Sequence, residues 1–144
     1  MRIVGGKYKS YIIPTSKKIK ARPTTDMAKE ALFNILENKI DFNQIYVLDL
    51  FCGTGNISYE FASRGVKEIT AVDHQINALQ FIQKQSSHWG MNINTKKKNA
   101  LSFLEITDDK YDVIFADPPY DFKRIDEIHD IIFKRKLLLS LIHI

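Results

Sequence analysis

Residues 47–56 read Val-Leu-Asp-Leu-Phe-Cys-Gly-Thr-Gly-Asn, and this stretch decides the fold of the chain. Its first half is an almost unbroken apolar run, which is typical of a parallel strand covered on both faces. Gly53 and Gly55 permit a sharp turn and let the backbone approach a ligand closely. A helix is expected to begin near Asn56, with its unpaired N–H groups facing the same crevice. We therefore predict an α/β fold whose parallel sheet carries helices on both faces.

Asp49 interrupts this apolar run, so its position requires an explanation. A dinucleotide fingerprint, G-x-G-x-x-G, would need a third glycine where the chain has Ser58. A carboxylate just before the turn is a poor neighbour for a pyrophosphate but a good one for an ammonium group, such as the amine of S-adenosylmethionine. These features disfavour a nicotinamide dehydrogenase and favour S-adenosylmethionine as the cofactor. The alternative is a structural turn in which Asp49 caps the following helix.

Length and composition indicate one soluble domain. The 144 residues suffice for a sizeable core, and no run of 18 apolar residues predicts a membrane span. The first residues lack the apolar region of a signal peptide. Cys52 is the only cysteine, so no intrachain disulfide can form, and no Cys/His cluster indicates a metal site. We expect a cytoplasmic, monomeric protein without a metal or a membrane partner.

Positive charge is concentrated at the N-terminus. Residues 1–22 hold seven basic residues and no acid, while residues 23–144 hold 14 basic and 17 acidic residues. Tyr8 and Tyr11 lie among these cations and could either stack on unpaired bases or tie the segment to the domain. We interpret residues 1–22 as a basic arm that contacts RNA, with a short hairpin near Gly5 and Gly6. A solvated, lysine-rich terminus is the alternative.

A helix is predicted to follow this arm. Thr25 is a natural N-cap, and Asp26 suits the positive end of the helix. The apolar stripe is predicted to contain Met27, Ala31, Leu32, Ile35 and Leu36.

Two further strand ends carry polar residues. Asp73 ends the next buried strand, where a carboxylate can accept both ribose hydroxyls of a nucleoside. Asn99 and Ala100 follow the third strand, where a side-chain amide and a backbone N–H could read an adenine edge. Asp73 could instead serve as an N-cap for the next helix.

Asp117-Pro118-Pro119-Tyr120 follows the fourth strand, Tyr111 to Ala116. The two prolines fix φ twice and prevent the chain from continuing as a helix. The Asp117 carboxylate and the Pro118 carbonyl then form a pair of acceptors, and Tyr120 offers a flat stacking face. Two acceptors beside a stacking face suit the exocyclic amine of a purine. Taken alone, the stretch could be only a rigid turn.

Over roughly residues 1–135 the sequence resembles the bacterial 16S rRNA guanine-N2 methyltransferases, which belong to the class I S-adenosylmethionine-dependent enzymes with a Rossmann-like sheet. The stretches that carry the resemblance are residues 2–7, 22–26, 29–34, 49–55, 99–104 and 117–120. The family normally has seven strands in the order 3-2-1-4-5-7-6, whereas this sequence accommodates four or five. We therefore expect the order 3-2-1-4-5 with the last strands missing, so that the methyltransferase domain, residues 23–144, is incomplete at its C-terminus. Residues 137–144 are interpreted as a fifth strand or a tail.

The resemblance and the residue chemistry together predict three groups of site residues. The catalytic group is Asp117, Pro118 and Tyr120. The cofactor-binding group is Asp49, Phe51, Gly53, Gly55, Asp73, Asn99 and Ala100. The RNA-binding group is Arg2, Lys7, Lys9, Arg22, Thr24, Pro119 and Phe122, with Phe122 in a loop that covers the target base.

The predicted activity is methylation of the N2 amine of one guanine in 16S rRNA, either free or in the assembling small subunit. Adenine-N6 methylation of DNA is an alternative, because it uses the same pair of acceptors. A catalytically incomplete module that only binds RNA is another.

Overall fold

The computed structural model describes residues 1–20 and 24–139, and all structural statements refer to these residues. The predicted site residue Arg22 lies outside them. Among the described residues we find no helix with the length and apolar character needed to cross a membrane.

Four parallel strands form the central sheet, in the order β3-β2-β1-β4. Val47 of β1 pairs with Ile69 of β2 on one side and with Val113 of β4 on the other. The predicted parallel sheet and the first four positions of its order are thus confirmed. The strand bounds are Tyr46–Leu50 for β1, Glu68–Asp73 for β2, Ile93–Lys97 for β3 and Val113–Ala116 for β4.

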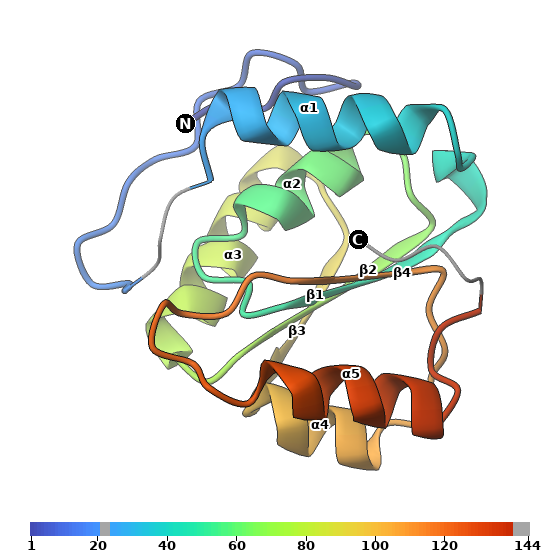
Figure 1. Ribbon diagram of the computed structural model, residues 1–144. Coiled ribbons are helices and arrows are strands. Elements are labelled where there is room, and N and C mark those ends of the chain that lie inside the picture. Colours follow the sequence, from blue (N-terminus) through green and yellow to red (C-terminus); the bar gives the residue numbers. More distant parts are fainter. Residues whose placement is uncertain (21–23, 140–144) are drawn as a thin grey trace.

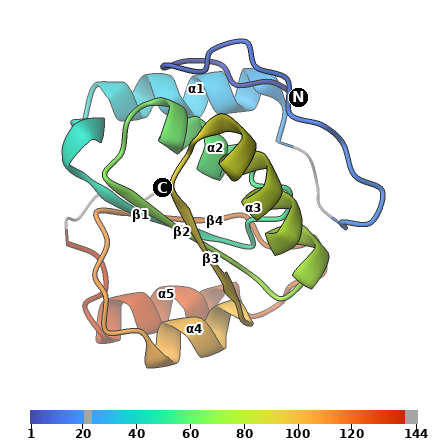
Figure 2. The same ribbon diagram turned by 180° about the vertical axis from the view of Figure 1, so that it is seen from behind.

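Helices cover both faces of the sheet, as the apolar strands require. The sheet therefore lies between two layers of helices (Figures 1 and 2). The first face carries α1 (Asp26–Glu37), α2 (Asn56–Ser63) and α3 (Ile76–Trp89), and the second carries α4 (Ala100–Ile106) and α5 (Ile125–Lys134). A short 3-10 helix, η1 (Phe42–Gln44), leads into β1.

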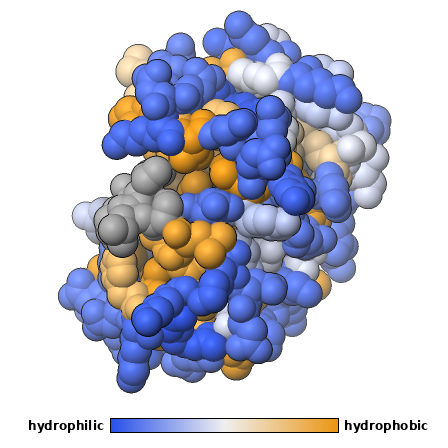
Figure 3. Space-filling view, turned by 90° about the vertical axis from the view of Figure 1, so that its right-hand side faces the viewer, coloured by the Kyte–Doolittle hydropathy of each residue, from blue (hydrophilic) through white to orange (hydrophobic). Residues whose placement is uncertain are grey.

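Strand β4 is an edge strand of the described sheet. A single parallel bridge joins Tyr111, just before β4, to Leu138, and it marks the position where a fifth strand was expected. No fifth strand forms within the described residues. Figure 3, which looks onto the right-hand side of Figure 1, shows hydrophobic residues at the surface of that side of the molecule.

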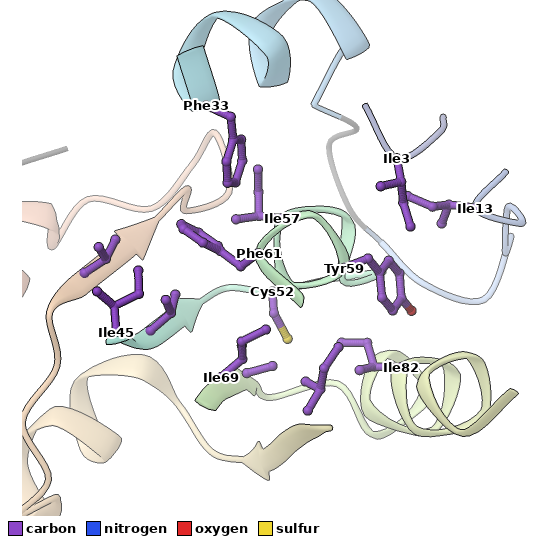
Figure 4. Close-up of a cluster of buried hydrophobic side chains, with 14 of the residues drawn as sticks. Ile3, Ile13, Phe33, Ile45, Cys52, Ile57, Tyr59, Phe61, Ile69 and Ile82 are labelled. Carbon is purple, nitrogen blue, oxygen red and sulfur yellow. The ribbon is translucent and has the colours of Figure 1, made fainter. Parts of the chain in front are cut away.

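The N-terminal segment packs on the first face of the sheet. Ile3 and Ile13 are fully buried and belong to the same hydrophobic cluster as the helices α1 to α3 (Figure 4). Arg2 and Ile12 form an antiparallel bridge, in agreement with the expected hairpin. The Tyr8 hydroxyl donates to the carbonyl oxygen of Trp89 at 2.8 Å, so this tyrosine ties the segment to the domain.

Helix α1 begins as predicted, with the Thr25 hydroxyl accepting from the backbone N–H of Ala28. The predicted stripe is wrong in part, because Met27 is 81% exposed, and Ala31 and Ile35 are exposed as well. The buried residues of this helix are Lys29, Phe33 and Leu36. Because the buried face includes a lysine, apolar periodicity alone does not predict its position.

Candidate functional site

The glycine turn after β1 is built from residues that adopt positive φ. Phe51, Gly53 and Gly55 have φ of 57°, 52° and 87°, and the Gly55 N–H donates to the Cys52 carbonyl at 2.8 Å. A Cβ at Gly55 would lie 2.8 Å from Cγ1 of Ile82, so any other residue at this position would be both crowded and strained. Helix α2 starts immediately after the turn and directs its first N–H groups toward the carboxyl ends of the strands.

Asp49 is buried on β1 beneath this turn. The Ser58 hydroxyl of α2 donates to its Oδ2 at 2.6 Å. Burial raises the pKa of Asp49 to about 7, and the Ser58 hydrogen bond only partly opposes this effect. None of the described residues that affect this pKa, namely Ser58, Asp73 and Asp117, is a cation. The ammonium group of a ligand would therefore stabilise the charged form of Asp49.

Asp73 at the end of β2 links two loops. Its Oδ2 accepts from the Gly53 N–H at 3.0 Å, and its Oδ1 accepts from the Gln75 N–H at 2.9 Å. The carboxylate is thus held rigidly against the glycine turn and the start of α3. Each oxygen retains a further lone pair for a ligand hydroxyl.

The ends of β1, β2 and β4 meet at a single cavity of about 290 Å³. Nine predicted site residues line it: Thr24, Asp49, Phe51, Gly53, Asp73, Asp117, Pro118, Pro119 and Tyr120. Tyr120 is 94% exposed, which leaves its ring accessible to a second molecule at the cavity. The glycine turn and the Asp-Pro-Pro-Tyr stretch therefore share one cavity.

A second hollow of about 170 Å³ adjoins the first and shares Phe51, Asp73, His74 and Pro119 with it. Asn99, Ala100 and Phe122 also line this hollow. The rings of Phe51 and Phe122 pack edge to face at 5.0 Å. Asn99 is the N-cap of α4 and accepts from the Leu101 N–H at 2.9 Å, so its amide orientation is fixed.

Some predicted residues lie elsewhere. Gly55, Arg2, Lys7 and Lys9 line neither hollow. Conversely, sequence reasoning did not assign several lining residues to the site, namely Lys20, Cys52, Thr54, Asn56, Ile57, His74, Gln75 and Phe115. Cys52, Thr54 and Asn56 could have been found from their places within or next to the glycine turn. No sequence pattern places Lys20 at the site, because its position depends on two hydrogen bonds between its backbone and the side chain of Gln75, 55 residues further along the chain.

The donor set suits a particular kind of ligand. Two carboxylates at neighbouring strand ends can bind an ammonium group and hydroxyl groups, while the N-terminus of α2 can bind a carboxylate. Phe51, Pro119 and Phe122 add flat apolar surface for a planar ring. Within the described residues, no group of three or more His, Cys, Asp or Glu side chains could hold a metal ion.

Solved structures of similar fold place this domain in a known class. The Escherichia coli protein yhhF superposes with a TM-score of 0.84 over 96% of this chain and 74% of its own, at 26% sequence identity. With its parallel sheet, glycine turn and strand-end acids, the domain is of the Rossmann-like class I methyltransferase type.

The chain belongs to the family described as Conserved hypothetical protein 95, whose model matches residues 1–142. Relatives include the uncharacterized methylase RP545 of Rickettsia prowazekii, 28% identical, with 96% of this chain and 80% of that protein covered. The Ribosomal RNA small subunit methyltransferase D of Buchnera aphidicola subsp. Baizongia pistaciae is 32% identical, with 83% of this chain covered. The protein of the same name from Escherichia coli K12 is 31% identical, again with 83% of this chain covered. This chain spans 61% and 60% of the lengths of these two methyltransferases.

Proposed function

We propose that this chain is an S-adenosylmethionine-dependent methyltransferase domain that acts on the N2 amine of a guanine in 16S rRNA. The observation that carries this proposal is the single cavity shared by the Asp49 turn and the Asp117-to-Tyr120 stretch. Relatives named as ribosomal RNA small subunit methyltransferases support the choice of rRNA. The guanine N2 position rests on the chemistry of the acceptor pair and on the sequence resemblance.

The cofactor would occupy both hollows. Asp49 and the Gly53 backbone would hold the methionine part, with the Asp49 carboxylate facing its ammonium group. Asp73 would accept from the ribose hydroxyls, and Asn99 with Ala100 would read the adenine edge in the second hollow. The packing of Phe122 on Phe51 also favours a role for Phe122 beside the adenine, in addition to its predicted cover of the target base.

S-adenosylmethionine supplies an activated methyl group on its sulfonium, so the protein has to bind and align the two reactants. Asp117 and the Pro118 carbonyl would accept the two N–H bonds of the guanine amine. These two contacts would orient the nitrogen lone pair toward the methyl donor and would draw the nitrogen toward tetrahedral geometry. Tyr120 and Pro119 would hold the flipped base by stacking, and the exposure of Tyr120 suits this role.

The RNA backbone would contact the basic N-terminal segment through Arg2, Lys7, Lys9 and Arg22, with Thr24 at the entrance of the cavity. Arg2 and Lys9 are exposed, and the net positive charge of residues 1–22 favours a phosphate backbone. In this proposal the protein works as a monomer on 16S rRNA or on an assembling small subunit.

Two other functions make different predictions. A DNA adenine-N6 methyltransferase would methylate naked DNA, whereas the proposed enzyme would methylate rRNA or small-subunit particles. An RNA-binding module would bind RNA but not S-adenosylhomocysteine. Titration calorimetry together with methyl incorporation into the three substrates separates these functions.

The direct test replaces Asp117 with alanine. We expect methyl transfer to rRNA to fall by at least about 100-fold, because an acceptor of the reacting amine is lost. Binding of S-adenosylhomocysteine should change less than about threefold. Asp130→Ala, which removes an exposed carboxylate on α5, serves as the control and should leave both quantities unchanged. Undiminished transfer by Asp117→Ala would refute the role of Asp117.

A further inference from the structure

Lys29 of α1 is fully buried, yet its ammonium group has three partners. Its Nζ donates to the Arg2 carbonyl at 2.6 Å and to Oδ1 of Asn56 at 2.7 Å, and it lies 3.3 Å from Oε1 of Glu60. An ammonium group has three N–H donors, so these contacts account for all of them. The partners come from the N-terminal segment and from two turns of α2.

One of these partners reaches the cavity. Asn56 is the first residue of α2 and lines the cavity beside the glycine turn. Because Lys29 can only donate, the amide oxygen of Asn56 must face it, which directs Nδ2 toward the Thr24 carbonyl at 3.0 Å. Thr24 also lines the cavity. Lys29 therefore orients Asn56 directly and Thr24 through Asn56, although Lys29 itself does not line the cavity.

Another partner reaches the N-terminal segment. The Glu60 carboxylate accepts from the N–H groups of Val4 and Gly5 at 2.8 and 3.0 Å. Arg64 also donates to Glu60, at 2.9 Å. Ser63, on the same helix, accepts from the Tyr8 N–H through its hydroxyl. The backbone of the basic segment is thus held on α2 by the same buried network that orients Asn56.

Buried ion pairs contribute little net stability compared with apolar side chains of similar size, since both charges lose their hydration. The contacts of this network indicate a role other than stabilising the fold. It joins the two places that the proposed function assigns to RNA and to the cofactor, and it does so through hydrogen-bonded side chains that are largely buried.

We propose that Lys29 is a positioning residue that couples the cofactor cavity to the basic N-terminal segment. The proposal rests on the proposed function, since it takes S-adenosylmethionine as the ligand of the cavity. A ligand that reduces the mobility of Asn56 in the cavity also reduces the mobility of the Val4 and Gly5 backbone. Because such coupling is reciprocal, RNA bound to the segment also strengthens cofactor binding.

Amide hydrogen exchange of the unmodified chain tests this coupling with S-adenosylhomocysteine as the probe. Binding should slow exchange at the Val4 and Gly5 amides by about fivefold or more, the lower end of typical coupling. The Leu137 amide, which donates to the Ile132 carbonyl on the other face of the sheet, should change less than twofold and serves as the internal reference. Unchanged exchange at Val4 and Gly5 in the saturated protein would overturn the coupling.

Lys29→Met tests the role of the ammonium group, with Lys39→Met at an exposed lysine as the matched control. The Lys29 variant should bind S-adenosylhomocysteine but lose the added protection at Val4 and Gly5, whereas the Lys39 variant should retain it. If Lys29→Met does not fold, Asn56→Ala replaces it, because this change breaks the link to the cavity and leaves the Lys29–Glu60 pair. Retained protection in the folded variant would overturn the proposal. Failure of the unmodified chain to bind the probe would instead overturn the proposed function, and with it this inference.

Discussion

At the scale of single residues, the protonation of the Asp49 carboxyl group depends strongly on its surroundings. Asp49 lies at the end of a strand buried on both faces, and its pKa is about 7 because burial opposes ionisation. The native carboxyl group keeps its proton up to about pH 7, whereas the unfolded one releases it near its ordinary pKa of 3.8. The native state binds more protons at Asp49 in this window, so the contribution of Asp49 to the stability of the ligand-free protein falls as the pH rises from about 4 to 7.

The same raised pKa predicts a pH dependence of ligand binding. If the ionised carboxylate binds the ammonium group of S-adenosylhomocysteine, the affinity should fall by about tenfold for each pH unit below 7. Calorimetric titrations between pH 5.5 and 8 measure this. Asp49→Asn should bind more weakly at pH 8 and show a flat profile. A flat profile for the unmodified protein would show that Asp49 does not bind the ammonium group in its charged form.

At the scale of elements, the connection from β1 to α2 is constrained both by its own backbone and by a neighbouring strand. Three positive φ angles occur within five residues, and the Asp73 carboxylate holds the turn from β2. The turn is therefore shaped by a neighbouring strand as well as by its own glycines.

Substitution of Gly55 tests how tightly this turn is packed. In Gly55→Ala the new Cβ would meet Cγ1 of Ile82 at 2.8 Å and Cζ of Tyr59 at 3.0 Å, in addition to the strain at φ +87°. We expect a loss of about 2–4 kcal/mol in the free energy of unfolding, as both strain and overpacking contribute. Urea denaturation measures it.

Gly90→Ala is the matched control for this prediction. Gly90 ends α3 at φ +71°, but a Cβ there meets nothing within 4 Å. This variant should lose only about 1 kcal/mol, the cost of the left-handed conformation. Equal losses of unfolding free energy in both variants would mean that Ile82 and Tyr59 move aside for the new Cβ at no cost.

At the scale of the whole molecule, the N-terminal segment and the domain share one hydrophobic core. Its buried isoleucines lie against the face that carries α1 to α3, while its basic side chains Arg2 and Lys9 remain exposed. The segment is therefore anchored by its apolar residues and presents its charges outward. This arrangement gives a proposed RNA-binding surface a fixed position relative to the cavity.

Ile3→Ala tests the anchoring. We expect a loss of about 2–5 kcal/mol, because a fully buried isoleucine is truncated. Ile12→Ala, at a position 76% exposed in the same hairpin, should stay within about 0.5 kcal/mol of the unmodified protein. Thermal or urea unfolding measures both. A loss for Ile3→Ala as small as that for Ile12→Ala would indicate a segment that folds independently of the core.

Sequence by itself determined the parallel sheet and the meeting of the Asp49 and Asp117 stretches at one edge, and the family resemblance of the sequence implied the strand order. Apolar runs and glycine turns are local signals, and the carboxyl ends of parallel strands necessarily share an edge. Tertiary structure alone decided the burial of Lys29, the orientation of Asn56 and the docking of the Val4 and Gly5 backbone on Glu60. These contacts join residues 27 to 56 positions apart, and local periodicity carries no information about such partners. Buried charges are stable only where the folded chain assembles all of their partners, so their positions follow from packing and not from pattern.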